Sequence, residues 1–278
     1  MKASIRALAV KFYQCLEQFG FDPLRTIRAF RALPGFVGDW FEFSRKIANR
    51  TTDEFGGRLL LYPQVGDQDL GAGAVTNHYF QMDLFVAQLV CAARPQKHVD
   101  IGSRIDGFVA HVASSMPVTV LDIRPLADIV IKNISFQQAD LMDESRDWDA
   151  FASESVSCLH ALEHFGLGRY GDDLDPVAYE RGIRNLTRMV KKGGILYLAV
   201  PVSVTPRIEF NAHRVFSFPH LRKLVTNAFN IESVAIVDDK GFLQTDLAWD
   251  AEQADRSWDC RYGCVIMALR KQYLANAK

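Results

Sequence analysis

From Lys97 onward, short apolar runs alternate with stretches of helical spacing, and this alternation limits the folds open to the chain. Apolar strands that alternate with crossover helices are typical of a parallel sheet. The last two runs lie close together, after a helix predicted at 219–228, so we expect that pair to be antiparallel. The sequence therefore predicts an α/β fold with a mostly parallel sheet of about seven strands, at residues 99–100, 118–121, 134–137, 156–159, 195–200, 231–237 and 262–269.

The first 50 residues have a different pattern and predict helices. Apolar residues recur at helical spacing up to Phe19, and Gly20 supplies a stop. Asp22 and Pro23 have the residue types of an N-cap and a first helical position. We expect the Pro-Gly pair at 34–35 to end that second helix and a third helix to cover 36–47.

Residues 51–75 are rich in glycine and have no clear period, which predicts a loop that covers a site. A long helix is then expected from Thr76 to Cys91. These boundaries predict two domains, a helical N-terminal lobe with its covering loop at 1–75 and an α/β domain at 76–278.

The bulk composition excludes several classes of protein. A net charge of −1 gives no electrostatic reason to expect nucleic acid as a partner. Five scattered cysteines form no CxxC pair, so we expect no metal site, no disulfide framework and a reducing cytoplasm. No apolar run approaches the ~20 residues of a membrane span, and polar residues interrupt any signal-peptide core. The composition leaves the oligomeric state open.

Three acids stand at the ends of consecutive predicted strands. Asp100 closes the first strand, Asp122 closes the second, and Asp140 follows the third. Ligands of open α/β sheets bind at the carboxyl ends of the strands. The spacing suits Asp122 for accepting both hydroxyls of a ribose, and Asp140 for accepting from an adenine amine. The predicted cofactor contacts are Asp100, Gly102, Ser103, Arg104, Asp122, Ile123, Asp140, Leu141 and His160.

Arg104 stands where a nucleotide-binding loop of this kind usually has its middle glycine. A residue with a side chain restricts the loop mostly to negative φ, so we expect the turn to differ from the usual one. Three interpretations remain open. Arg104 faces solvent and pairs with Asp106, or binds the carboxylate of a cofactor, or selects a different anionic ligand such as a nucleotide sugar.

Together these residues resemble the class I S-adenosylmethionine-dependent methyltransferases, over about Lys97 to Leu269. The chain also resembles a methyltransferase-like family of unassigned function that occurs in nematodes and in bacterial polysaccharide gene clusters. The resemblance implies a seven-stranded, Rossmann-like methyltransferase sheet with S-adenosylmethionine as cofactor. The matching segments are Asp100-Ile-Gly-Ser-Arg-Ile-Asp-Gly-Phe108, Asp122-Ile-Arg-Pro125, Ser157-Cys-Leu-His-Ala-Leu-Glu-His-Phe-Gly-Leu-Gly-Arg-Tyr-Gly-Asp172, Gly193-Gly-Ile195, Val200-Pro201 and Phe210-Asn-Ala-His-Arg-Val-Phe216.

Methyl transfer requires alignment of the reacting atoms and a base for the acceptor proton. His164, after the fourth strand, and His213, after the fifth, are the candidate bases, since histidine titrates near neutral pH. Glu163 is the candidate orienting partner, and Arg214 and Arg169 are candidates for holding an acceptor. We expect O-methylation of a small molecule, with a sugar or surface-glycan precursor as the acceptor that the family context implies.

Other functions remain open. The chain could be an enzyme or binding protein for a nucleotide sugar, or a non-catalytic partner in glycan assembly. A nicotinamide oxidoreductase is disfavoured because the turn lacks a full GxGxxG pattern. The segment His160-Ala-Leu-Glu-His164 has the HxxEH spacing of some zinc proteases, but Gly166 and Gly168 follow at once and disfavour the long helix such a site needs.

Overall fold

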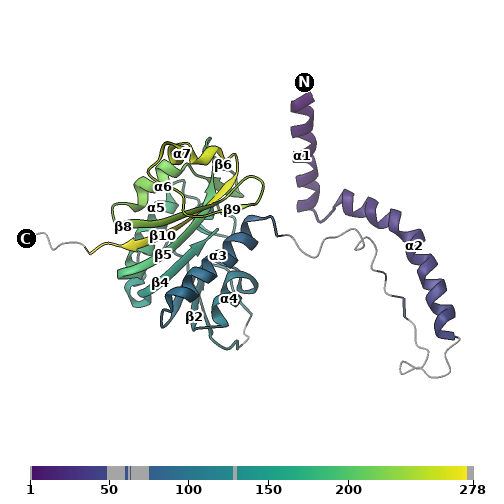
Figure 1. Ribbon diagram of the computed structural model, residues 1–278, viewed down its shortest axis with the longest axis horizontal. Coiled ribbons are helices and arrows are strands. Elements are labelled where there is room, and N and C mark those ends of the chain that lie inside the picture. Colours follow the sequence, from purple (N-terminus) through teal and green to yellow (C-terminus); the bar gives the residue numbers. More distant parts are fainter. Residues whose placement is uncertain (1, 49–59, 62, 64–74, 128–129, 274–278) are drawn as a thin grey trace, which may run out of the picture. The chain divides into compact units, whose positions relative to one another are not determined.

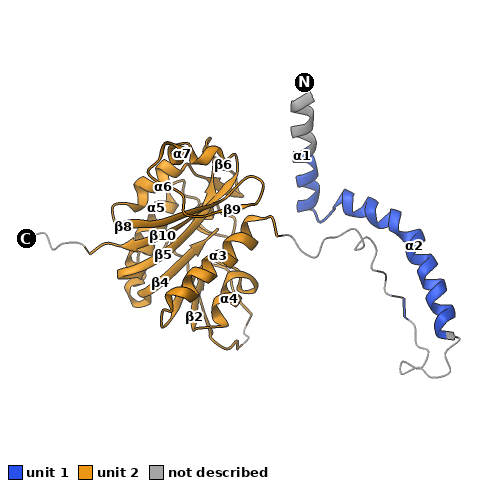
Figure 2. Ribbon diagram, in the orientation of Figure 1, with its two compact units in different colours: residues 1–73 blue, residues 74–278 orange. Residues whose placement is uncertain are grey.

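The computed structural model describes the chain except for residues 1, 49–59, 62, 64–74, 128–129 and 274–278. Two compact units divide it, at residues 1–73 and 74–278 (Figure 2). The predicted covering loop lies mostly outside the described residues, and its covering role stays a prediction. Within the described residues, no helix has the length and apolar character needed to cross a membrane.

The first unit contains two helices, α1 (Lys2–Gln18) and α2 (Pro23–Ala48). As predicted, Gly20 follows α1 with a φ of 78°, and Asp22 accepts a hydrogen bond from the backbone of Arg25 at the start of α2. The predicted break at residues 34–35 is wrong, because α2 runs through Pro34 without interruption. A proline removes one backbone donor and bends a helix, and α2 is visibly curved (Figure 1).

The second unit is built on an eight-stranded mixed sheet, with strand order β3-β2-β1-β4-β5-β10-β8-β9 (Figure 1). Strands β1 to β5 pair in parallel, whereas β10 is antiparallel to both β5 and β8. The predicted α/β class and the antiparallel final pair are confirmed. The strands are β1 (His98–Ile101), β2 (Val118–Asp122), β3 (Ile134–Gln138), β4 (Ser153–Leu159), β5 (Val190–Val202), β8 (Phe229–Val237), β9 (Leu243–Gln244) and β10 (Gly263–Lys271).

Helices cover both faces of this sheet. One face packs against α3 and α4 through a core that includes Met82, Phe108 and Tyr197. The other packs against α5, α6 and a short turn through a core that includes Trp148, Leu186 and Leu198. Strand side chains alternate between the two cores, as the two-residue period of a strand requires. The helical segments are α3 (His78–Ala93), α4 (Ala110–Ala113), α5 (Ala178–Met189), α6 (Phe218–Val225), α7 (Glu252–Asp255), and short turns at Ile105–Val109, Trp148–Phe151, Leu162–His164 and Ser257–Asp259.

A second, two-stranded sheet follows β5 and was not predicted. It pairs β6 (Arg207–Glu209) with β7 (His213–Val215) in antiparallel register. Strand order in the main sheet reverses between β1 and β4, whose following loops therefore diverge and leave a crevice at their carboxyl ends. The candidate site lies there.

Candidate functional site

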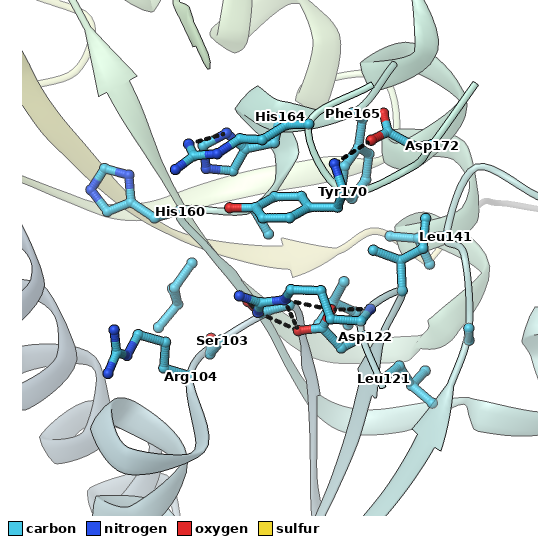
Figure 3. Close-up of a pocket in the computed structure, with 18 of the residues that line it drawn as sticks. Ser103, Arg104, Leu121, Asp122, Leu141, His160, His164, Phe165, Tyr170 and Asp172 are labelled. Carbon is cyan, nitrogen blue, oxygen red and sulfur yellow. Dashed lines mark hydrogen bonds and ion pairs between the residues drawn. The ribbon is translucent and has the colours of Figure 1, made fainter. Parts of the chain in front are cut away.

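A pocket of about 650 Å³ opens at the carboxyl ends of β1, β2, β3 and β4. This volume is within the range of small-molecule and cofactor sites. His160, His164 and Tyr170 lie along one side, across from Ser103, Arg104 and Asp122 (Figure 3). The predicted site residues that line the pocket are Gly102, Ser103, Arg104, Asp122, Ile123, Asp140, Leu141, His160 and His164.

The loop after β1 needs glycine at residue 102 and does not need it at residue 104. Gly102 has a φ of 76°, and a Cβ atom there would lie 2.7 Å from the Cβ of Ala161. Arg104 instead has φ −70° and ψ 137°, which any residue adopts. The arginine therefore fits the backbone of the loop without strain.

Arg104 has the first of its three predicted arrangements. Its guanidinium donates two hydrogen bonds to Asp106, of 2.9 and 2.6 Å, at the edge of the pocket. About 70% of each side chain is exposed. An ion pair this exposed contributes little to stability and leaves the pocket open.

Asp100 is fully buried and does not line the pocket, so its predicted contact with a cofactor is revised. Its carboxylate accepts hydrogen bonds from the backbone N–H of Ser103, at 3.1 Å, and from the Ser103 hydroxyl, at 2.8 Å. Burial raises the pKa of Asp100 to about 6, although these hydrogen bonds oppose the rise. Asp100 therefore shapes the loop through these hydrogen bonds.

A buried histidine, His98, is linked to Asp100 through the Ser157 hydroxyl. The Ser157 hydroxyl donates to Asp100, so it must accept from His98 Nε2, which lies 2.8 Å away. The Nδ1 atom of His98 then accepts from the Ser155 hydroxyl, also at 2.8 Å. This arrangement is that of a neutral imidazole, the form that burial favours by lowering the pKa of His98 to about 3.

We expect His98 to make the fold sensitive to acid. The pKa of His98 is about 3 in the folded chain and 6.5 for an ordinary histidine, the value expected in the unfolded chain. Between these two pH values the unfolded state binds more protons than the folded state. The free energy of unfolding therefore falls as the pH falls from 6.5 towards 3. The contribution lost between pH 7 and pH 5 is about 2 kcal/mol. Urea unfolding gives the free energy of unfolding of wild type and of the His98→Gln variant. The difference between the two should be smaller at pH 5 than at pH 7 by that amount. A difference that stays constant with pH would contradict a neutral His98.

Asp122 is bound by an arginine that the sequence analysis did not single out. The Arg124 guanidinium pairs with the Asp122 carboxylate and donates a 3.0 Å hydrogen bond to the Gly102 carbonyl. It also lies 5.1 Å from the centre of the Tyr170 ring. The carboxylate predicted for ribose hydroxyls therefore already has a cationic partner.

Asp140 lies on the next strand end and is half-buried at the pocket wall. It accepts a 2.9 Å hydrogen bond from the backbone of Met142, and burial raises its pKa. The Leu141 carbonyl is held by Asn185, at 2.8 Å, which fixes this turn against α5. These two hydrogen bonds fix the backbone that follows Asp140.

His160 and Glu163 form a buried pair after β4. The distance from His160 Nδ1 to Glu163 Oε1 is 2.6 Å, and each side chain is less than 5% exposed. Burial opposes the charge on both groups. For His160, nearby Cys264 and Glu163 outweigh burial and raise its pKa well above the usual value, while His160 keeps the pKa of Glu163 below its usual range. Glu163, the predicted orienting partner, thus makes its short contact with His160 and not with His164.

His164 combines pocket access with a defined tautomer. Its Nδ1 atom lies 2.7 Å from the Ala212 carbonyl, so Nδ1 carries the proton. Burial lowers the pKa of His164, which favours the neutral ring with a free lone pair on Nε2. Nε2 lies 3.8 Å from Glu163 Oε1, beyond a direct hydrogen bond.

The other two predicted catalytic residues do not line the pocket. His213 packs edge-on against His164, with ring centres 6.3 Å apart, and lies 3.3 Å from Glu209. Arg214 is only 3% exposed and its guanidinium is occupied by backbone carbonyls, so we revise its predicted contact with an acceptor. Both residues contact the loop after β4, His213 through the His164 ring and Arg214 through the Phe165 carbonyl.

Tyr170 and Arg124 are among the pocket residues that sequence reasoning missed. Asp172 accepts hydrogen bonds from the backbones of Gly168 and Tyr170, both at 3.1 Å, and this turn places the tyrosine ring in the pocket (Figure 3). The available signal was the cluster of glycines with Asp172 around Tyr170, residue types that favour a turn. For Arg124 the signal was its position two residues after Asp122.

A family model described as "Caenorhabditis protein of unknown function, DUF268" matches residues 128–269 of the chain. No curated protein sequence matches the chain.

Several solved methyltransferase structures have a similar fold. The N-methyltransferase NodS from Bradyrhizobium japonicum WM9, in complex with S-adenosylhomocysteine, is 14% identical with a TM-score of 0.45, covering 70% of this chain and 88% of NodS. The 1,6-didemethyltoxoflavin-N1-methyltransferase of Burkholderia thailandensis is 16% identical with a TM-score of 0.48, covering 68% and 78%. A putative sarcosine dimethylglycine methyltransferase from Galdieria sulphuraria is 12% identical with a TM-score of 0.46, covering 69% and 86%. Identities this low attach no ligand or reaction to this chain.

Proposed function

The chain belongs to the DUF268 family, and on that premise we propose that it transfers a methyl group from S-adenosylmethionine to a hydroxyl group of a small acceptor. One observation carries the proposal: Asp122 and Asp140, at the ends of neighbouring strands, line one pocket together with the Gly102 turn. A sugar or surface-glycan precursor is the acceptor class that we propose from the family resemblance.

The pocket residues fit the parts of the cofactor under one condition. Asp140 would accept from the adenine amine, and Asp122 would accept from the ribose hydroxyls. The backbone at Gly102 permits close approach because no side chain projects there. The condition is that Arg124 must release or share the Asp122 carboxylate, to which it is now bound.

His164 is the base in this proposal. When bound, S-adenosylmethionine would supply an activated methyl group, and its sulfonium sulfur would become a neutral thioether as the methyl carbon bonds to the acceptor oxygen. The Nε2 lone pair of His164 takes the proton that the acceptor hydroxyl loses. The Ala212 carbonyl fixes the Nδ1–H tautomer that this step needs. Arg169, which also lines the pocket, lies near His164 and is placed to hold a polar acceptor.

A nucleotide sugar is the second candidate ligand, and the position of Arg124 favours it. A guanidinium beside the predicted ribose site suits a phosphate, which it binds through two parallel hydrogen bonds. In that case Arg124 would turn from Asp122 to the ligand. The two functions therefore make opposite predictions for the removal of this side chain.

We expect calorimetric titration of the Arg124→Ala variant to show S-adenosylhomocysteine binding about 3- to 10-fold more tightly than to wild type. In the variant the ribose hydroxyls no longer compete with Arg124 for the Asp122 carboxylate. That partly exposed ion pair contributes about 1 kcal/mol. The matched control is Arg104→Ala, which removes an exposed arginine from the edge of the same pocket. It should change the affinity by less than about 2-fold.

The absence of wild-type binding at millimolar S-adenosylhomocysteine would refute the methyltransferase proposal. Binding of UDP-glucose to wild type, with loss of that binding in Arg124→Ala, would establish the nucleotide-sugar alternative instead.

A further inference from the structure

Three side chains with metal-binding atoms meet beside the pocket, from segments far apart in the sequence. His78 is the first residue of α3, His160 follows β4, and Cys264 lies on β10. One donor atom from each lies within 4.8 Å of the other two. His160 and Cys264 are buried, and His78 is half-buried. The fold therefore concentrates two imidazoles and a thiol at one point.

The His160 ring is arranged like that of a metal ligand. Its Nδ1 atom is held by Glu163 at 2.6 Å, whereas its Nε2 atom is buried and makes no hydrogen bond of normal geometry with the described residues, although Cys264 is close enough to raise the pKa of the ring. Histidines that bind metals almost always donate their other ring N–H to a carboxylate or carbonyl. A buried ring nitrogen without a partner is costly unless a ligand satisfies it.

The backbone and the charge balance point the same way. His160 has a φ of 50°, a left-handed conformation that costs a non-glycine residue about 1–3 kcal/mol and concentrates at functional sites. Glu163 is 1% exposed and its second carboxylate oxygen also lacks a partner among the described residues. A divalent cation beside His160 would offset the charges of this carboxylate and of a Cys264 thiolate.

We propose that His78, His160 and Cys264 bind a thiophilic divalent cation, Zn²⁺ in the first instance, with Glu163 as the carboxylate that orients His160. Two nitrogens and one thiolate are a zinc donor set. Donor atoms around a tetrahedral zinc stand about 3.3–3.6 Å apart, so the three donor atoms, which now lie within 4.8 Å of one another, must move closer together. We expect His78 to make this adjustment, because it is half-buried at the start of α3 and its ring already stacks on His160 with ring centres 5.6 Å apart.

The ion would lie at the wall of the pocket, because His160 lines it. Three protein donors leave one coordination position, which is the arrangement of zinc sites that bind water or substrate. Imidazole and thiolate ligands must be deprotonated to bind a metal, so binding releases protons and weakens with acid. This site does not depend on methyl transfer, and its test does not involve S-adenosylhomocysteine.

The test uses the untagged full-length chain, stripped with a chelator and titrated with Zn²⁺ against a chromogenic competitor. We expect one Zn²⁺ per chain, and a thiolate-to-metal absorption band when Co²⁺ is bound instead. Cys264→Ser should abolish that band and weaken Zn²⁺ binding by at least about 10-fold. Glu163→Gln keeps all three ligands and should weaken it by about 10- to 100-fold.

Two controls match the residue types. His111→Gln removes an exposed histidine, and Cys158→Ser removes a buried cysteine on β4, and both should bind Zn²⁺ like wild type. If Cys264→Ser does not fold, His78→Gln takes its place, because His78 is half-buried at a helix start. A wild-type chain that binds no stoichiometric Zn²⁺, or ligand variants that bind it as tightly as wild type, would overturn the proposal.

Discussion

Replacing Arg214 by methionine is expected to lower the free energy of unfolding by about 3–5 kcal/mol. The Arg214 side chain is buried, and its guanidinium donates to the carbonyls of Phe165, Asp175 and Pro176, the last two at 3.2 and 3.0 Å. Methionine fills similar space but leaves these carbonyls without donors. Hydrogen bonds to a charged group contribute about 1.5–3 kcal/mol each, so losing several produces a large effect.

Arg207→Met is the matched control for Arg214→Met. Arg214 lies on β7, and Arg207 lies on β6, the strand that pairs with β7. Its ion pair with Glu209 is partly exposed, so we expect a loss under about 1 kcal/mol. Urea unfolding measures both variants. Equal losses would show that the carbonyl contacts of Arg214 contribute nothing specific. A large loss for Arg214 alone would also explain a loss of activity without an acceptor contact.

The sequence allowed the sheet and one side of the pocket to be predicted for a simple reason. Buried parallel strands are short apolar runs, and the residue that follows each run lies at the ligand-binding edge. Gly102, Asp122 and Asp140 were placed at the pocket by this argument, and the structure brings all three there. Positions defined by the period of a strand are accessible from local sequence.

Pairing between distant side chains is not accessible in the same way. Arg214 contacts a carbonyl 49 positions away, and the HxxEH segment divides so that Glu163 serves His160 while His164 faces the pocket. No local pattern records such partners. The three-residue strands β6 and β7 were missed because they are too short for a period to be visible. The expectation of no metal site rested on the absence of CxxC spacing, and such a pattern does not register side chains that only the fold brings together, as it does His78, His160 and Cys264.

Gly102→Ala is expected to destabilise the chain by about 2–6 kcal/mol and to abolish ligand binding in the pocket. The left-handed backbone, with a φ of 76°, costs alanine about 1–3 kcal/mol. The new methyl would also lie 2.7 Å from the Cβ of Ala161, and this contact between short side chains cannot be relieved by rotation. Overpacking of this kind costs about 1–3 kcal/mol more and pushes the loops after β1 and β4 apart.

Gly171→Ala separates the two causes. Gly171 has a φ of 83°, but no atom lies within 4 Å of where its Cβ would stand. Gly171→Ala therefore introduces backbone strain without a steric clash. We expect it to lower the free energy of unfolding by only about 1–3 kcal/mol. Urea unfolding and S-adenosylhomocysteine titration of both variants provide the comparison. If Gly102→Ala loses no more stability than Gly171→Ala and keeps wild-type ligand affinity, then the close approach of residue 102 to Ala161 does not shape the pocket.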